Sequence, residues 1–152
     1  MILYLDTSAL LKKYFQEVGS NEIIAKWQEA TGIVTSSVAY AEALAAIHRK
    51  KRETKFDNDK LLKILDTFRC DWSSFIRVDV TDDLNQWIDK IVSRYPLRGF
   101  DAVHLASAIV VHDKLPDEEY LFGCFGKKLL LAAHMAGLKT LPDIAERTFD
   151  GL

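Results

Sequence analysis

The sequence has 152 residues, the usual length of a single domain, and this is enough to bury a hydrophobic core without metals or disulfides. Apolar residues make up 49% of the chain and the net charge is −2, which is typical of a soluble globular protein. This charge argues against a nucleic-acid binder that relies on an overall positive charge, but it is compatible with a nuclease that uses local basic patches.

The compartment can be predicted from the cysteines and from the apolar runs. Cys70 and Cys124 are far apart and form no CxxC pair, so we expect free thiols in a reducing compartment. The first apolar run has no basic region ahead of it, and no run approaches the ~20 residues of a membrane span. We therefore expect one cytoplasmic domain over residues 1–152, with no membrane partner.

Short apolar or alternating segments predict strands, and segments with helical periodicity lie between them. The predicted strands lie at residues 2–5, 33–35, 75–80, 120–122 and 138–141. The predicted helices lie at about 9–15, 21–30, 38–52, 58–72, 82–95, 100–112 and 127–136, with a short one from 142. Helix caps are expected from Ser20, from Ser36 or Ser37, from Asp57 or Asn58, and from Thr81. Strands that alternate with helices in this way predict an α/β fold with a parallel sheet covered on both faces.

Three acids lie where strands end or helices begin. Asp6 follows the first strand and could serve only as an N-cap, and Asp101 opens an apolar helix, where the helix dipole alone would favour it. Glu42 has Val38 and Ala46 as its i−4 and i+4 neighbours, so it lacks the partner of an exposed ion pair. Taken by itself, each acid has a structural explanation, although these neighbours weaken that of Glu42, an exposed charge in an i,i+4 pair.

Taken together, the three acids predict a more specific site. The carboxyl ends of parallel strands meet at one edge of a sheet, so Asp6, Glu42 and Asp101 could converge there. Clustered carboxylates repel one another and favour a hard divalent cation such as Mg²⁺ or Mn²⁺. Such a cation lowers the pKa of a bound water and neutralises phosphate charge, which is the chemistry of phosphodiester hydrolysis.

The acids belong to three short motifs, DTSA at 6–9, SVAYAE at 37–42 and DAVHLASA at 101–108. These motifs resemble those of PIN-domain ribonucleases, and in particular the VapC-type toxins of type II toxin–antitoxin pairs, over nearly the whole chain. The resemblance implies a PIN-like three-layer α/β/α sandwich with a central parallel sheet of four to five short strands. It also implies a metal-dependent endoribonuclease that uses Mg²⁺ or Mn²⁺, forms a homodimer and is blocked by a cognate antitoxin.

The same resemblance implies roles for single residues. Asp6, Glu42 and Asp101 match the acidic metal ligands of the family, and Thr7 or Ser8 matches a hydroxyl that orients metal-bound water or an acid. The last motif of the family departs from its usual form here. Cys124 stands where Ser or Thr is usual, and Gly126 stands where a fourth acid is usual. The alternative function is therefore a catalytically weakened PIN domain that acts as an RNA- or antitoxin-binding module.

Basic residues near these motifs could follow an RNA backbone into the acidic site, although a solvated helix end is an equal explanation for the first four. They are Arg49, Lys50, Lys51, Arg52, Lys127 and Lys128. His104 follows Asp101 by one helical turn, and we interpret it as a core or supporting histidine rather than a catalytic base.

Other phosphotransfer folds fit less well. A haloacid-dehalogenase phosphatase would need a second Asp two residues after Asp6, where Ser8 stands instead. A response-regulator receiver would need an acidic pair ahead of a later phospho-accepting Asp. Neither a glycine-rich dinucleotide motif nor a P-loop is found, which argues against a nucleotide cofactor.

Overall fold

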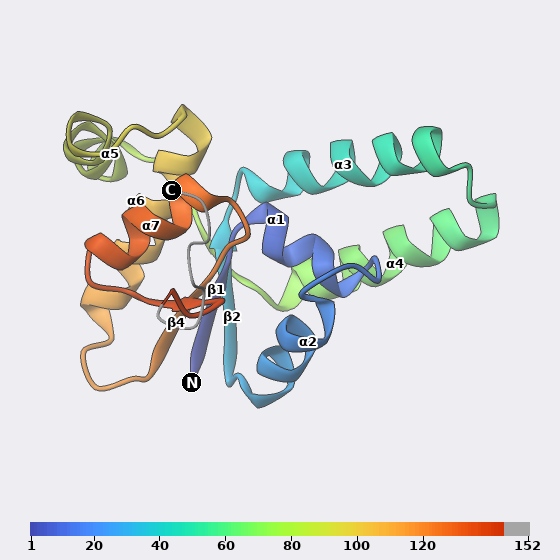
Figure 1. Ribbon diagram of the computed structural model, residues 1–152, viewed down its shortest axis with the longest axis horizontal. Helices are drawn as coiled ribbons and strands as arrows, with labels where there is room; N and C mark the ends of the chain where they lie inside the picture. The colour runs from blue at the N-terminus through green and yellow to red at the C-terminus, as the bar shows by residue number, and fades with distance from the viewer. Residues whose placement is uncertain (145–152) are drawn as a thin grey trace.

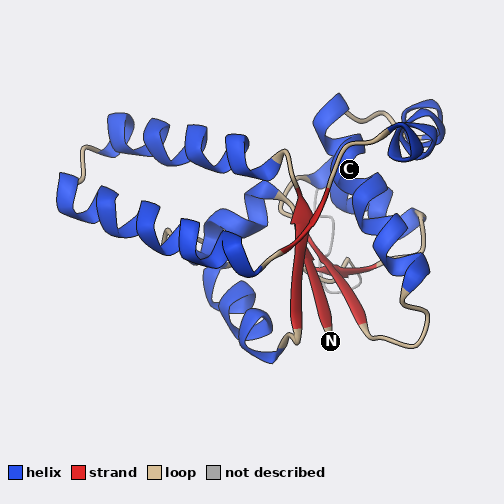
Figure 2. Cartoon of the chain, turned by 180° about the vertical axis from the view of Figure 1, so that it is seen from behind, coloured by secondary structure: helices blue, strands red, loops and turns tan. Residues whose placement is uncertain are grey.

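The computed structural model describes residues 1–144, and over these residues the chain forms one sheet of five parallel strands (Figure 2). The strands are β1 (Ile2–Leu5), β2 (Gly32–Ser36), β3 (Ile76–Val78), β4 (Tyr120–Gly123) and β5 (Lys139–Leu141). Their order across the sheet is β3-β2-β1-β4-β5, so that β1 lies at the centre between β2 and β4. This confirms the prediction of an α/β fold with a parallel sheet.

The helices cover both faces of the sheet, as a three-layer sandwich requires (Figure 1). They are α1 (Thr7–Leu10), a 3₁₀ turn at Leu11–Lys13, α2 (Ser20–Glu29), α3 (Ala39–Thr54), α4 (Asn58–Ser74), α5 (Asp82–Arg94), α6 (Gly99–Lys114) and α7 (Lys127–Met135). The antiparallel pair α3 and α4 extends far beyond the sheet (Figure 1). None of the helices in residues 1–144 combines the length and the apolar character needed to cross a membrane.

The central strand β1 separates two hydrophobic clusters, because its side chains alternate between the faces of the sheet. Leu3 and Leu5 pack with α1, α2, α3 and α4, whereas Ile2 and Tyr4 pack with α5, α6 and α7. Tyr4 is fully buried, and its ring stacks on Phe122 of β4 with the ring centroids 5.3 Å apart. Both faces of β1 are therefore buried, as its continuous apolar run predicts.

Two helices begin at the expected caps. Thr81 accepts a hydrogen bond from the backbone N–H of Leu84 and caps α5, and Asp57 accepts one from Lys60 and caps α4. Each cap satisfies one of the backbone N–H groups that a helix leaves without a partner in its first turn.

Two other predicted caps are wrong, because the serines close the turns that precede the helices. Ser20 Oγ accepts from the backbone N–H of Glu17, and Gly19 holds the N-cap position of α2. Neither Ser36 nor Ser37 caps α3, since Ser36 Oγ accepts from Val38 N ahead of the helix. The short helix predicted from residue 142 is not formed by 142–144, and the rest of that prediction lies outside the described residues.

The chain diverges at the carboxyl ends of β1 and β4. From β1 the chain enters α1 on one face of the sheet, and from β4 it enters α7 on the other face. The backbone N–H of Asp6 still donates to the carbonyl of Gly123 at 3.1 Å, so the two strand ends stay joined up to this point. Ligands of open α/β sheets bind at such a divergence of two neighbouring strands.

Candidate active site

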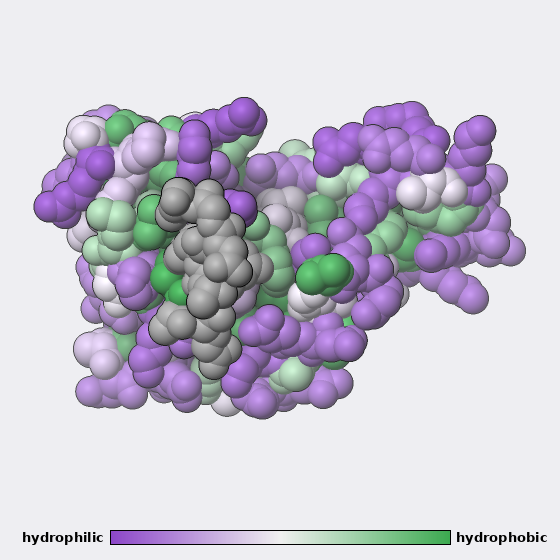
Figure 3. Space-filling model, viewed as in Figure 1, coloured by the Kyte–Doolittle hydropathy of each residue, from purple (hydrophilic) through white to green (hydrophobic). Residues whose placement is uncertain are grey.

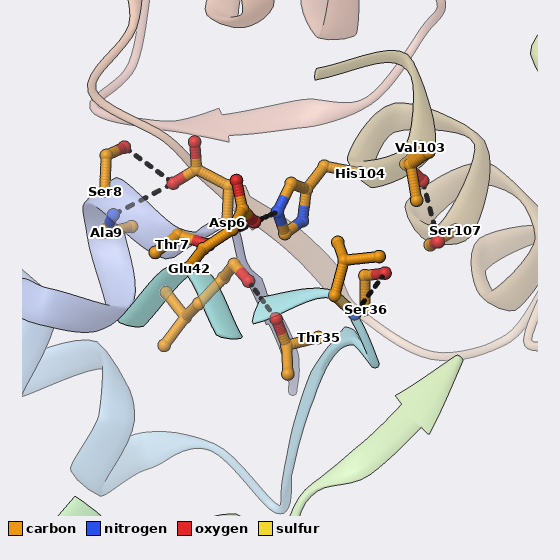
Figure 4. A network of polar contacts seen from close by, with 12 residues as sticks. Asp6, Thr7, Ser8, Ala9, Thr35, Ser36, Glu42, Val103, His104 and Ser107 are labelled. Carbon is orange, nitrogen blue, oxygen red and sulfur yellow. Dashed lines mark hydrogen bonds and ion pairs between the residues drawn. The ribbon is translucent and has the colours of Figure 1, made fainter. Parts of the chain in front are cut away.

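Asp6 lies directly after β1 and is 6% exposed. Its Oδ1 accepts the backbone N–H of Ala9 at 2.9 Å and the hydroxyl of Ser8 at 2.7 Å (Figure 4). Asp6 is therefore the N-cap of α1, which is one of the roles predicted for it from the sequence. The same hydrogen bonds fix the direction in which its carboxylate points.

Glu42 lies in the first turn of α3, with one carboxylate oxygen held by two donors. Thr7 Oγ1 donates to Glu42 Oε1 at 2.7 Å, and His104 Nε2 lies 2.9 Å from the same oxygen (Figure 4). Burial alone would raise the pKa of Glu42, but the hydrogen bonds from His104 and Thr7 lower it overall. The side chain is therefore ionised at neutral pH.

Asp101 lies in the first turn of α6 and is partly buried. Partial burial and the negative charge of Asp6, with a smaller effect of Glu42, raise its pKa above the ordinary value, although His104 and Arg98 oppose the shift. Among residues 1–144, no side chain or backbone group donates a hydrogen bond to Asp101. The fold thus brings the three predicted acids into electrostatic contact. Asp101 is the acid whose negative charge is least compensated by hydrogen-bond donors.

Replacing Asp101 by asparagine should raise the melting temperature of the metal-free protein at neutral pH. The folded-state pKa of Asp101 is raised, so ionisation of this side chain disfavours the fold. That cost is absent below the ordinary pKa of 3.8 and is complete once the pH exceeds the raised value. Thermal unfolding in EDTA at neutral and at acidic pH measures the difference, which should shrink in acid.

Asp82→Asn is the matched control, because Asp82 is an exposed acid in the first turn of α5 and its loss tests the helix dipole alone. It should leave the melting temperature unchanged or lower it. If the metal-free Asp101→Asn variant melts at or below the wild-type temperature at neutral pH, this would contradict the claim that repulsion between the acids destabilises the fold.

The two hydroxyls that follow Asp6 hold different acids. Thr7 donates to Glu42, whereas Ser8 donates to Asp6 and also accepts the backbone N–H of Phe125 at 3.1 Å. Ser8 therefore ties the loop after β4 to the carboxylate after β1. The sequence left open which of the two hydroxyls orients an acid, and the structure places both of them in that position.

The loop between β4 and α7 contains the two departures from the family pattern. Cys124 is buried, its Sγ donates to the carbonyl of Gly126 at 3.5 Å, and burial and the charge of Asp6 raise the pKa of its thiol. Gly126 holds the N-cap position of α7 with an extended backbone (φ −78°), and no side chain caps this helix. A Cβ at Gly126 would meet only Cys124 Sγ, at 3.9 Å, so a side chain could be accommodated there.

The donor set suits a hard divalent cation, because it consists of carboxylate oxygens that repel one another. Among residues 1–144, no group of three acidic, histidine or cysteine side chains is close enough to form a ready-made metal site. A cation shared by Asp6, Glu42 and Asp101 would have to draw these carboxylates together, and it would relieve the repulsion that raises the pKa of Asp101.

An open cavity of about 700 Å³ borders the acids and gives them access to solvent. Its wall includes Glu42 and Asp101, together with Val80, Ile88 and the side chain of Phe100, which is 60% exposed. The two carboxylates thus lie at the edge of a surface cavity that a polymeric substrate could reach.

Two of the six basic residues predicted to contact RNA are held by neighbours instead. Lys50 forms an ion pair with Glu17 at 2.8 Å, and Lys51 donates to the backbone carbonyl of Phe56. Hydrophilic side chains cover the projecting part of the α3–α4 hairpin (Figure 3). The other four are exposed to solvent: Arg49, Arg52, Lys127 and Lys128.

His104 is the residue whose contact with the site the sequence did not specify. It is buried, and it joins Tyr4 of β1 to Glu42 of α3 through its two ring nitrogens. The sequence feature that could have indicated this contact is the position of His104 three residues after Asp101, on the same side of α6. The prediction of a supporting histidine agrees with this geometry.

The chain is similar to known proteins in its sequence and in its fold. The PIN domain family model matches residues 3–115. Ribonuclease VapC45 and ribonuclease VapC49, from two strains of Mycobacterium tuberculosis, are each 29% identical over 141 residues, which cover 93% of this chain and 95% of theirs. The crystal structure of VapBC2 from Rickettsia felis, bound to a DNA fragment from their promoter, matches with a TM-score of 0.58 at 14% identity, covering 83% of this chain and 89% of that one. That likeness concerns the fold alone.

Proposed function

This chain belongs to the PIN domain family, and from that premise we propose that it is a divalent-metal-dependent endoribonuclease, the toxin of a toxin–antitoxin pair. The similarity to ribonucleases VapC45 and VapC49 over nearly the full chain supports the reaction. The observation that carries the proposal is that Asp101 lies within electrostatic range of both Asp6 and Glu42 at the carboxyl edge of the sheet, where partial burial and then these two charges raise its pKa.

In this proposal, Asp6, Glu42 and Asp101 hold Mg²⁺ or Mn²⁺. When bound, the cation supplies an activated water and neutralises charge on the RNA phosphate. The chain itself prepares the carboxylates for this task. Ser8 and the N-terminus of α1 orient Asp6, and Thr7 orients Glu42, so both acids are held in place before a ligand arrives.

The proposed partners are the RNA substrate, a cognate antitoxin and a second copy of the chain. The likeness of the fold to VapBC2 supports the antitoxin. For RNA, Lys127 and Lys128 lie in the first turn of α7 beside the site, whereas Arg49 and Arg52 lie seven and ten residues beyond Glu42 on α3. At 1.5 Å per residue, Arg49 is about 10 Å from Glu42 along the helix axis.

A second candidate function is a weakened nuclease that binds RNA or an antitoxin without efficient cleavage. Gly126 favours it, because this N-cap of α7 provides no fourth carboxylate. The buried thiol of Cys124 cannot replace it, since a neutral sulfur is a poor ligand for Mg²⁺.

The two candidates are separated by assaying the purified chain, free of any partner, on single-stranded and structured RNA. Cleavage that needs Mg²⁺ or Mn²⁺ and stops in EDTA supports the nuclease. RNA binding without cleavage in either metal supports the weakened module. Cleavage that continues unchanged in EDTA would contradict the proposed metal dependence.

Neutralising the two exposed arginines of α3 should weaken RNA binding and reduce its salt dependence. Removing one arginine–phosphate interaction should lower the slope of log affinity against log salt by about 0.7 for single strands. The measurement is fluorescence anisotropy with Arg49→Gln combined with Arg52→Gln, made in an Asp6→Asn background so that the RNA is not cut.

Lys114→Gln combined with Lys139→Gln is the matched control. It makes the same change in charge at the amino edge of the sheet, where α6 ends and β5 begins. The control should leave the slope close to that of the parent. Equal slopes for the arginine pair and for this control would contradict a role of α3 in RNA binding.

A further inference from the structure

One oxygen of Glu42 is held between two structural elements that carry the other acids. Thr7, which donates to Oε1, directly follows Asp6. His104, whose Nε2 lies 2.9 Å from the same oxygen, follows Asp101 by three residues on α6. A change in either contact would therefore alter the position of Glu42 relative to both other acids.

The contact between His104 and Glu42 defines the position of a proton. A carboxylate can only accept, so the hydrogen of this 2.9 Å contact lies on Nε2 of His104. In the neutral imidazole, Nδ1 is then an acceptor, and it lies 2.8 Å from the hydroxyl of Tyr4. The phenolic O–H of Tyr4 is fully buried and can donate to this nitrogen.

Tyr4 and His104 are held rigidly by the core. Tyr4 is fully buried, stacks on Phe122 and meets the His104 ring edge-on, with centroids 6.0 Å apart. His104 is 2% exposed, so neither ring can turn without repacking the core. Glu42 Oε2, by contrast, has no hydrogen-bond donor within residues 1–144.

We propose that Tyr4 and His104 are positioning residues for Glu42. Tyr4 selects the imidazole tautomer whose Nε2–H is directed at Oε1, and His104 then holds the carboxylate so that Oε2 remains available to a divalent cation. This inference rests on the proposed metal site, and neither residue touches RNA or exchanges a proton with it. Such indirect contacts typically change metal affinity or activity by 10- to 100-fold when they are removed.

The first test is made on metal-free protein in EDTA and does not depend on activity. The ring ¹⁵N resonances of His104 should show a protonated Nε2 and an unprotonated Nδ1. Tyr4→Phe removes one hydroxyl and should alter the Nδ1 resonance. Tyr120→Phe is the matched control, because Tyr120 is also buried and its hydroxyl donates to the backbone carbonyl of Ala108, away from Glu42. A proton found on Nδ1, or equal spectra for both variants, would overturn the proposal.

The second test is Mn²⁺ affinity, measured by calorimetry. His104→Leu should weaken binding about tenfold or more, and His104→Gln, whose amide N–H can still reach Oε1, should restore most of it. Tyr4→Phe should weaken binding more than Tyr120→Phe, although both variants lack a buried hydrogen bond and should melt at similarly lowered temperatures. Mn²⁺ binding by a folded His104→Leu variant at wild-type affinity would overturn the positioning role.

Failure of this inference can be distinguished from failure of the proposed function. If the chain cuts no RNA but the variants change the His104 resonances and Mn²⁺ affinity as expected, the positioning stands and the ribonuclease proposal fails. If RNA is cut in Mg²⁺ and none of the variants alters cleavage, resonances or affinity, the ribonuclease stands and the positioning fails.

Discussion

Asp6→Asn is expected to reduce RNA cleavage by at least about 100-fold while the protein remains folded. Residues that only support a metal ligand cost up to about 100-fold when they are changed, and a direct ligand should cost more. Stability should change little, because asparagine caps a helix about as well as aspartate and its amide oxygen can still accept from Ala9 and Ser8. Single-turnover cleavage and thermal unfolding measure the two effects separately.

Asp57→Asn is the matched control for this substitution. Asp57 is also an N-cap, of α4, and it accepts the backbone N–H of Lys60 in an exposed position at the outer end of the α3–α4 hairpin (Figure 1). The control should cleave RNA at the wild-type rate. If Asp6→Asn cleaves as fast as Asp57→Asn, Asp6 is only a helix cap.

The second large effect is expected from Gly126→Asp, which should increase Mn²⁺ affinity on the order of tenfold and raise the rate of cleavage in Mg²⁺. Metal affinity depends on the number of charged ligands, and this position is two residues after Cys124, whose thiol is in electrostatic contact with Asp6 and Asp101. The backbone at Gly126 is extended, and an added Cβ meets only Cys124 Sγ at van der Waals distance. Aspartate should also cap α7, stabilising the fold by a few tenths of a kcal/mol, about the difference between aspartate and glycine as caps.

Gly126→Asn separates the two consequences of this change. Asparagine has nearly the same shape and can cap α7, but it brings no charge, so it should raise stability without raising metal affinity. Calorimetry with Mn²⁺ compares the pair. Equal affinities for the aspartate and asparagine variants would show that position 126 does not belong to the cation site.

Local patterns were sufficient to predict the fold and to single out three acids for the proposed site. The continuous apolar run of β1 and the helical periodicity of the segments around it predict a parallel sheet, and Asp6 and Asp101 can be singled out because each lies where such an element ends or begins. Glu42 can be singled out because its neighbours Val38 and Ala46 provide no ion-pair partner, and because it ends the SVAYAE motif. These features depend on residues that are close in the sequence, which a single sequence can show.

The remaining details depend on contacts between distant segments. The bonds from Tyr4 to His104 and from His104 to Glu42 join residues 100 and 62 positions apart. For the same reason, Lys50 could be assigned to RNA from its sequence neighbours, although it pairs with Glu17 across 33 positions. The wrong cap at Ser20 has another cause, because serine can close a turn as well as start a helix.

The most direct test of a shared cation site is a Mn²⁺ titration of the wild-type chain, Asp6→Asn and Asp101→Asn in the absence of RNA and of any partner protein. We expect saturable binding to the wild type and a weakening of at least about 100-fold in each variant, because each removes a ligand of the same ion. Binding of Mn²⁺ by both variants with wild-type affinity would contradict the assignment of these acids to a metal site.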